Sequence, residues 1–197
     1  MSETRARIVE AAQRLFHEQG YAATGIATIL READVRSGSL YHFFPSKEAL
    51  LEAVLDNYLE HLRPIVIGPI EEATSDPIER IFRLFDFYRE AVLATGFSYG
   101  CPIGNLALEV GGGDGAVTRK LDANLAAWRE AVEGWVRDAG PRMRKSVNAS
   151  DFAALVLSVM EGAVMQARTS KSIARYDASV AEFRRYVGLL TEARGKA

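Results

Sequence analysis

Several residue types and patterns are scarce in this chain of 197 residues, and each scarcity excludes a class of protein. The single cysteine, Cys101, excludes an internal disulfide framework and favours the reducing cytoplasm. No stretch approaches the ~18 consecutive apolar residues of a membrane helix, and no apolar segment of a secretory signal follows Met1. The formal net charge of −2 shows no basic excess, so contacts with nucleic acid would have to be local. We therefore expect a globular, cytoplasmic protein.

The patterns that carry catalytic or metal chemistry are missing as well. His17, His42 and His61 form no i, i+4 pair and have no cysteine beside them, so no metal site is expected. The glycine-rich run at 111–115 lacks the Lys-Ser/Thr ending of a phosphate-binding loop, and no serine elbow occurs. The sequence thus predicts a protein that is not an enzyme and holds no cofactor or metal.

Apolar residues recur at three- and four-residue spacing almost throughout, which predicts an all-α chain. The expected helices are 4–19, 25–33, 37–43, 46–63, 76–96, 103–110, 117–140, 150–168 and 173–193. Gly20 fits a left-handed C-terminal cap, while Thr24, Ser46 and Asp76 fit N-terminal caps.

Residues 65–75 are interrupted by Gly68 and Pro69, and they indicate a connector after the fourth helix, which is expected to stop near Pro64. This predicts an N-terminal domain at 1–63, whose last helix links it to a C-terminal helical bundle at 64–197.

The spacing of the short N-terminal helices indicates a helix-turn-helix. The second and third are separated by Asp34-Val35-Arg36, which matches the three- to four-residue turn of that motif, and Asp34 tolerates a left-handed conformation. On the third helix, Leu40 and either Phe43 or Phe44 are expected to face inward. Its outward side chains would be small or polar, suited to phosphates and base edges: Arg36, Ser37, Ser39, Tyr41 and His42.

The pattern Gly-x-Leu-Tyr-x-x-Phe-x-x-Lys, which runs from Gly38 to Lys47, closely resembles the signature of the TetR/AcrR family of bacterial transcription regulators. The likeness covers about the first sixty residues and includes Leu15 and Phe16 of the first helix. Asp34 stands where the family usually has glycine, and Arg36 where a serine often caps the third helix, a task that Ser37 could take over.

The resemblance implies a role for each matching residue. Phosphate contacts are expected from Thr24, Thr28, Tyr41 and Lys47. Arg36, Ser37, Ser39 and His42 would face the major groove, with Gly38 allowing close approach of the backbone, and Arg36 is the candidate for a bidentate contact to guanine. The alternative is that Tyr41 and Phe43 are core aromatics and the charges a solvated face.

The C-terminal helices carry an aromatic and thioether cluster with a few polar side chains. An effector pocket in this domain is implied by the resemblance, and its candidate residues are Phe82, Phe85, Tyr88, Cys101, Asn105, Glu109, Trp128, Met160 and Gln166. The alternative is an ordinary core, in which Cys101 is a small buried side chain rather than a redox sensor.

The last two helices each carry an apolar stripe, and the resemblance implies that they form a four-helix interface between two copies of the chain. The expected interface residues are Phe152, Leu155, Val156, Val159, Phe183, Val187 and Leu190. Internal packing is the alternative, whereas a two-fold dimer suits a palindromic operator.

Taken together, these features predict a homodimeric, ligand-responsive transcription regulator, expected to be a repressor released from a palindromic double-stranded operator by a small apolar or aromatic effector. The rival interpretation is a helical ligand-binding protein or enzyme that retains a vestigial DNA module. The exposed polar set on the third helix favours the regulator. Whether binding represses or activates depends on where the operator lies relative to the promoter.

Overall fold

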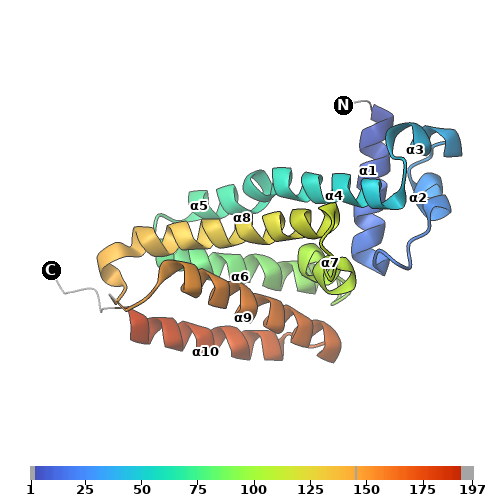
Figure 1. Ribbon diagram of the computed structural model, residues 1–197. Coiled ribbons are helices and arrows are strands. Elements are labelled where there is room, and N and C mark those ends of the chain that lie inside the picture. Colours follow the sequence, from blue (N-terminus) through green and yellow to red (C-terminus); the bar gives the residue numbers. More distant parts are fainter. Residues whose placement is uncertain (1–2, 145, 192–197) are drawn as a thin grey trace. The chain divides into compact units, whose positions relative to one another are not determined.

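The computed structural model describes residues 3–144 and 146–191, and within these ranges the regular elements are helices (Figure 1). An isolated antiparallel bridge joins Met143 to Thr191. The predicted all-α fold is confirmed. Within the same ranges, no helix has the length and apolar content needed to cross a membrane.

The chain forms two compact units. Unit 1 consists of residues 1–61 and 102–125, and unit 2 of residues 62–101 and 126–197. This grouping differs from the boundary expected at residue 63, because residues 102–125 pack with the N-terminal helices. The functional division into DNA-binding and effector domains stays a prediction.

Unit 1 begins with α1 (Glu3–Gln19), α2 (Ile26–Glu32), α3 (Ser37–Phe43) and α4 (Lys47–Leu62). α1 packs against both α2 and α3. The left-handed cap predicted after α1 is confirmed, since Gly20 has a φ of +86°. The Ser46 hydroxyl accepts a hydrogen bond from the Ala49 amide at 3.0 Å, so the predicted cap of α4 is confirmed as well.

Two later helices complete unit 1: α7 (Pro102–Val110), which lies against α1, and the first part of α8 (Ala116–Ala139). In this part of α8, Asn124 is buried and its side-chain amide donates to the Leu55 carbonyl at 3.1 Å. One turn earlier, the Lys120 ammonium pairs with the Asp56 carboxylate at 2.5 Å. These bonds attach the start of α8 to α4.

The connector expected at 65–75 is helical. A π-helical turn (Arg63–Ile67) follows α4 directly and leads into α5 (Gly68–Ala73). Pro64 and Pro69 each occupy one of the first two positions of their element. The end of α4 at Leu62 agrees with the stop expected near Pro64, but helical structure continues beyond it.

The remaining elements of unit 2 are α6 (Pro77–Ala94), the rest of α8, a 3-10 turn (Gly140–Arg142), α9 (Ala149–Ser170) and α10 (Ala174–Leu190). Asp76 caps α6 as predicted, accepting from the amides of Ile78 at 2.9 Å and Glu79 at 3.4 Å. Asn148 caps α9 in the same way, so this helix starts one residue earlier than expected. The end predicted for the last helix, at residue 193, lies outside the described residues.

An aromatic core joins α6, α9 and α10, which lie side by side (Figure 1). The ring of Phe183 lies 5.5 Å from that of Phe85, 6.2 Å from Phe82 and 5.8 Å from Phe152, centre to centre. The buried Tyr176 hydroxyl donates to the Phe85 carbonyl at 2.6 Å. Aromatic pairs at such separations contribute about 0.5–1.5 kcal/mol each beyond the area they bury, so this cluster holds the three helices together.

Candidate nucleic-acid interface

α3 buries one face and exposes the other. Leu40 and Phe44 are 0% and 2% exposed, whereas Tyr41, between them in the sequence, is 60% exposed. The predicted orientation is confirmed for Leu40 and Phe44, with Phe44 rather than the half-buried Phe43 as the inward aromatic. The alternative that Tyr41 is a core aromatic does not fit its exposure.

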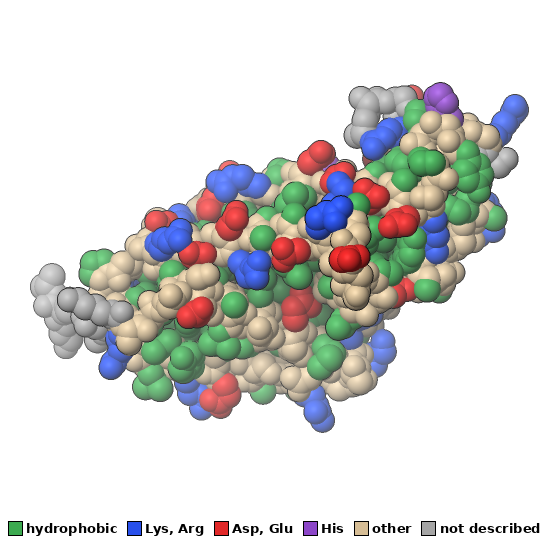
Figure 2. Space-filling view, in the orientation of Figure 1, with side chains coloured by type: hydrophobic (Ala, Val, Ile, Leu, Met, Phe, Trp, Pro, Cys, Tyr) green, Lys and Arg blue, Asp and Glu red, His purple; other side chains and the backbone are tan. Residues whose placement is uncertain are grey.

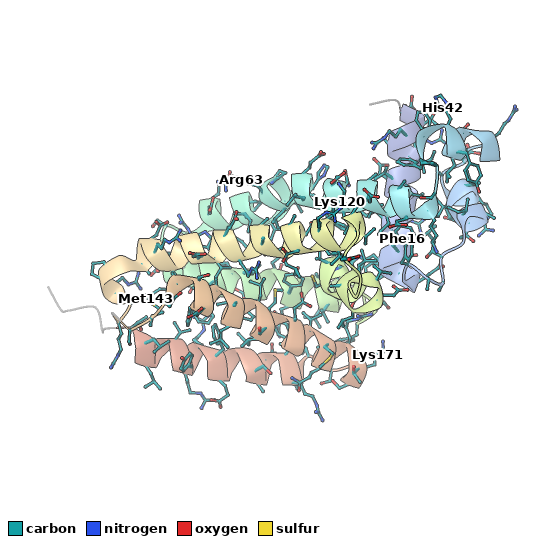
Figure 3. The ribbon with its side chains drawn as sticks, viewed as in Figure 1. Phe16, His42, Arg63, Lys120, Met143 and Lys171 are labelled. Carbon is teal, nitrogen blue, oxygen red and sulfur yellow. The ribbon has the colours of Figure 1, made fainter. Side chains whose placement is uncertain are left out.

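The outer surface of α3 is polar. Beside Tyr41, the exposed residues are Arg36, Gly38 and His42, and Ser39 is half-buried. A Cβ built on Gly38 would meet no atom within 4 Å, so this surface is open to a partner. Among the described residues, no acidic side chain pairs with Arg36. Figure 3 labels His42 on α3.

The start of α3 differs in one detail from the expectation. Arg36 is the N-cap residue, in extended conformation with ψ of 150°, and it provides no side-chain cap. Ser37 is the first helical residue, so the prediction that Ser37 caps the helix is wrong. The side chain of Ser37 lies outside the described part of the structure.

The turn between α2 and α3 is held by an arginine of α1. Asp34 has a φ of +52°, so the predicted left-handed conformation is confirmed. The Arg7 guanidinium donates to the carbonyls of Ala33 at 2.5 Å and Asp34 at 2.8 Å, and it reaches the Asp34 carboxylate at 3.3 Å. These bonds give the two turn carbonyls, which lie outside the helices, a hydrogen-bond donor. They also fix the start of α3 relative to α1.

Thr24 has a different role from the one expected. It is 0% exposed, and its hydroxyl donates to the Gly20 carbonyl at 2.7 Å. The N-cap of α2 is Gly25, without a side-chain cap, so the cap predicted for Thr24 is wrong. A fully buried hydroxyl has no surface to offer a phosphate, so the structure corrects this expectation too. Thr28, in the first turn of α2, is half-buried.

Lys47 stands at the first residue of α4 and bonds internally. Its ammonium donates to the Tyr21 carbonyl at 2.5 Å and lies 4.2 Å from the centre of the Tyr21 ring. Burial lowers the pKa of Lys47, and the nearby Glu109 carboxylate opposes that shift. Because an ammonium has three donors, this bond leaves Lys47 able to meet a phosphate while its side chain is held in place.

The apolar members of the predicted effector pocket lie in the core of unit 2. Those that are buried there are Phe82, Phe85, Tyr88, Trp128 and Met160. The rings of Tyr88 and Trp128 lie 5.7 Å apart, whereas Phe82 and Phe85 pack on Phe183. The structure therefore gathers these side chains as a core, in agreement with the alternative stated above, and their part in effector binding stays a prediction.

A polar group, in which Tyr88 and Cys101 are buried and Glu161 is half-buried, accompanies these rings. The Tyr88 hydroxyl donates to the Cys101 Sγ at 3.5 Å, and the Glu161 carboxyl group also hydrogen-bonds to Cys101. Burial raises the pKa of both Tyr88 and Glu161. Sequence reasoning missed Glu161, although an acidic residue within the apolar run Val159-Met160-Glu161-Gly162-Ala163 was a signal that could have found it.

The three polar candidates for the pocket are divided between the two units. Asn105 and Glu109 belong to α7 of unit 1, and the Glu109 carboxylate is bonded to the amides of Tyr21 and Ala22. Gln166 is exposed on α9. The part of these three side chains in effector binding stays a prediction.

The residues expected at the dimer interface divide into two groups. Four are buried within the protomer, namely Phe152, Val156, Phe183 and Val187. Side chains already covered by their own chain cannot pack against another, so the structure corrects the prediction for these four. Leu155 is exposed, and Val159 and Leu190 are half-buried.

The outer surface of α9 and α10 is nevertheless partly apolar. Tyr186 is 44% exposed and Leu189 is 69% exposed. A groove of about 470 Å³ runs between the two helices, lined by residues that include Leu155, Gly162 and Gln166. Figure 2 shows hydrophobic side chains on the surface over these helices, among charged ones of both signs.

Within residues 3–144 and 146–191, no three His, Cys, Asp or Glu side chains lie close enough together to hold a metal ion. We assign no metal-binding role to any of these side chains.

Both parts of the sequence match families of known regulators. Residues 8–54 match the bacterial regulatory proteins of the tetR family. Residues 77–179 match the C-terminal domain of LmrA/YxaF-like transcriptional regulators.

Individual proteins match over nearly the whole chain. The uncharacterized HTH-type transcriptional regulator Rv0196 of Mycobacterium tuberculosis is 31% identical over 184 residues, which cover 90% of each chain. The HTH-type transcriptional regulator LmrA of Bacillus subtilis is 29% identical over 175 residues, covering 86% of this chain and 89% of that protein. The crystal structure of a TetR transcriptional regulator from Chloroflexus aurantiacus superposes with a TM-score of 0.84 at 28% identity and covers 96% of both chains.

Proposed function

Since the chain belongs to the tetR family of bacterial helix-turn-helix transcription regulators, we propose that it is a homodimeric repressor of the bacterial cytoplasm, released from its operator by a small effector. Each protomer inserts α3 into the major groove of one half-site of a palindrome. The half-sites lie about 34–36 Å apart, one turn of the duplex. A dimer bound over a promoter excludes the polymerase, and this is the basis for repression.

The observation that carries DNA recognition is the polar outer face of α3. It combines the unpaired Arg36 guanidinium, the exposed Tyr41 and His42, and an open surface at Gly38. Arginine reads guanine through two hydrogen bonds, while hydroxyl and imidazole groups serve phosphates and base edges. The Arg7 bonds to the turn hold this face in one orientation.

The effector proposal rests on the composition of unit 2. Tyr88, Cys101 and Glu161 form a polar group against the Trp128 ring, in a core otherwise made of apolar side chains. Such a combination suits a small aromatic or apolar molecule with one or two hydrogen-bonding groups. An effector lowers operator affinity only as far as it binds better to the conformation that does not bind DNA.

The DNA-binding proposal is tested by selecting duplexes from a random pool and measuring mobility shift across a salt titration. We expect Arg36→Ala to lose discrimination at one base position, by about ten- to hundred-fold, since a bidentate arginine contact contributes about 1–3 kcal/mol. Arg31→Ala, on α2, removes an arginine from another exposed position, where it pairs with Glu32 at 3.9 Å, and it should leave the preferred sequence unchanged. Failure of the wild type to select any sequence would favour the rival, a ligand-binding protein or enzyme.

The dimer proposal concerns the exposed face of α9 and α10. Leu189→Glu places a charge at a side chain that is 69% exposed in one chain and would be covered in a dimer. We expect sedimentation velocity to show dimeric wild type and a largely monomeric variant. Leu108→Glu, on α7 at 90% exposure, is the matched control and should remain a dimer. A dimer that survives Leu189→Glu would contradict this interface.

A further inference from the structure

One side chain of α7 is bonded to the turn that joins α1 to α2. The Glu109 carboxylate accepts a hydrogen bond from the Tyr21 amide at 2.8 Å with one oxygen, and from the Ala22 amide at 2.6 Å with the other. Both amides belong to the non-helical turn that follows α1, where a backbone N–H group must find an acceptor outside a helix. A carboxylate that accepts two main-chain bonds is a charge-assisted contact, stronger than a neutral one.

The backbone of this turn allows the carboxylate to come close. Gly20 adopts a φ of +86°, and a Cβ placed there would lie 3.2 Å from a Glu109 oxygen. Glycine therefore serves both the left-handed conformation and the approach of α7. The bond joins residues 87 and 88 positions apart in the chain, so it is a tertiary contact of unit 1.

Tyr21 is held from a second direction. Lys47 donates to its carbonyl and lies over its ring, and the Phe16 ring contacts the Tyr21 ring with centres 5.2 Å apart. The amide, carbonyl and ring of Tyr21 are thus all engaged, by α7, α4 and α1 respectively. The segment immediately before α2 has its position set by these contacts.

We propose that Glu109 is a positioning residue for operator binding. By holding the turn ahead of α2, it fixes the entry of α2 and the place of Lys47, and so keeps the DNA-binding face in the conformation that fits the operator. The inference rests on the proposed DNA-binding function. It also assigns a task to α7, the helix of unit 1 that carries Glu109.

Electrostatics alone and a positioning role predict opposite effects of removing Glu109 on the affinity for the operator, so the direction of the change in affinity tests the proposal. A carboxylate in a DNA-binding unit repels phosphates, so its removal should tighten binding or leave it unchanged. If Glu109 positions the turn, Glu109→Ala should instead weaken binding to the duplex selected by the wild type, by about ten-fold. Glu109→Gln keeps one acceptor oxygen and should lose about three-fold.

The matched control is Glu60→Ala, which removes a carboxylate from an exposed position near the end of α4. Affinities are measured by fluorescence anisotropy with the selected duplex, at several salt concentrations. We expect Glu109→Ala and Glu60→Ala to share one salt slope, with only the former weakened. Hydrogen exchange should show faster exchange of the Tyr21 and Ala22 amides in Glu109→Ala, and unchanged rates in α9.

Several outcomes would overturn the inference. The positioning role is refuted when Glu109→Ala binds the selected duplex as tightly as Glu60→Ala does, or more tightly. Should Glu109→Ala fail to fold by circular dichroism, Glu109→Gln decides, and affinity equal to the wild type then refutes the proposal. Failure of the wild type itself to bind any selected duplex refutes the DNA-binding function instead, and this inference with it.

Discussion

The left-handed residue in the helix-turn-helix offers a direct test of why this turn folds as it does. Asp34 has a φ of +52°, and its side chain is 98% exposed. A substitution there changes the conformational preference of the backbone while removing almost no packing. We predict that Asp34→Val is less stable than Asp34→Gly, because glycine adopts this conformation freely and a β-branched residue resists it.

The size of the difference follows from three contributions. Left-handed backbone costs an ordinary L-residue about 1–2 kcal/mol, and valine lies at the upper end. Glycine gives back about 0.5–1 kcal/mol through its greater freedom in the unfolded chain. The 3.3 Å contact between Arg7 and the Asp34 carboxylate is lost in both variants and cancels. We therefore expect Asp34→Val to unfold with a free energy about 1 kcal/mol lower than that of Asp34→Gly.

The assay is urea unfolding at one protein concentration, followed by circular dichroism in the helical region. The slope with urea should be the same for both variants, so that the midpoint alone reports the difference. Equal midpoints, or a more stable valine variant, would show that the turn does not depend on a left-handed residue at this position. The reasoning about Asp34 would then be refuted.

Two further predictions concern unit 2. The Arg142 guanidinium, bonded to Asp76 at 2.8 Å, lowers the pKa of Asp76, and so do the amide hydrogen bonds of the helix cap. The charge of Asp76 therefore stabilises the fold fully above about pH 4, the usual pKa of aspartate. This stabilisation is lost as the pH falls through the lower pKa of Asp76 in the folded protein. Asp76→Asn retains the cap and should lower the free energy of unfolding by about 0.5 kcal/mol, whereas Asp76→Ala loses both cap and charge and should lower it by about 2 kcal/mol. Urea titrations between about pH 7 and pH 3 measure both differences. A difference in stability between wild type and Asp76→Asn that grows in acid would contradict the role given to the Asp76 charge. Lys171 is the C-cap residue of α9 and has a φ of +50°. Lys171→Gly should therefore raise the free energy of unfolding by about 0.5–1 kcal/mol, although it removes a 3.4 Å hydrogen bond to the Phe97 carbonyl. A destabilised variant in urea unfolding would contradict this prediction.

The DNA-binding helices could be predicted because their determinants are local. The spacing of Leu40 and Phe44 sets the inward face of α3, and Gly20 and Ser46 mark helix ends within one turn of the residues they serve. Thr24 shows the limit of such reasoning. A threonine before a helix can cap it or bond to the preceding turn, and the sequence does not distinguish these two uses.

Long-range contacts were not predictable. No residue near Glu109 in the sequence indicates that its carboxylate accepts a hydrogen bond from the Ala22 amide, 87 positions earlier. The sequence pattern instead predicted Glu109 as a residue of the effector pocket. The same holds for α9, where Phe152 and Leu155 belong to one broad apolar stripe. Periodicity identifies such a stripe without telling which side faces the chain's own core, and only the fold separates the buried Phe152 from the exposed Leu155.

The charges of unit 1 explain how a chain with a net charge of −2 can still bind DNA. Several of its cations serve the fold: Arg7 holds the α2–α3 turn, Arg14 pairs with Glu18 and Glu32, and Lys47 bonds to a carbonyl. A cation that is paired with carboxylates, as Arg14 is, adds little to the diffuse attraction that governs non-specific binding. Affinity then depends on a small number of groups such as Arg36, held at defined positions by those internal bonds. A regulator built like this gains discrimination between operator and bulk DNA, because the sequence-independent part of its binding is small while the base-reading part is retained.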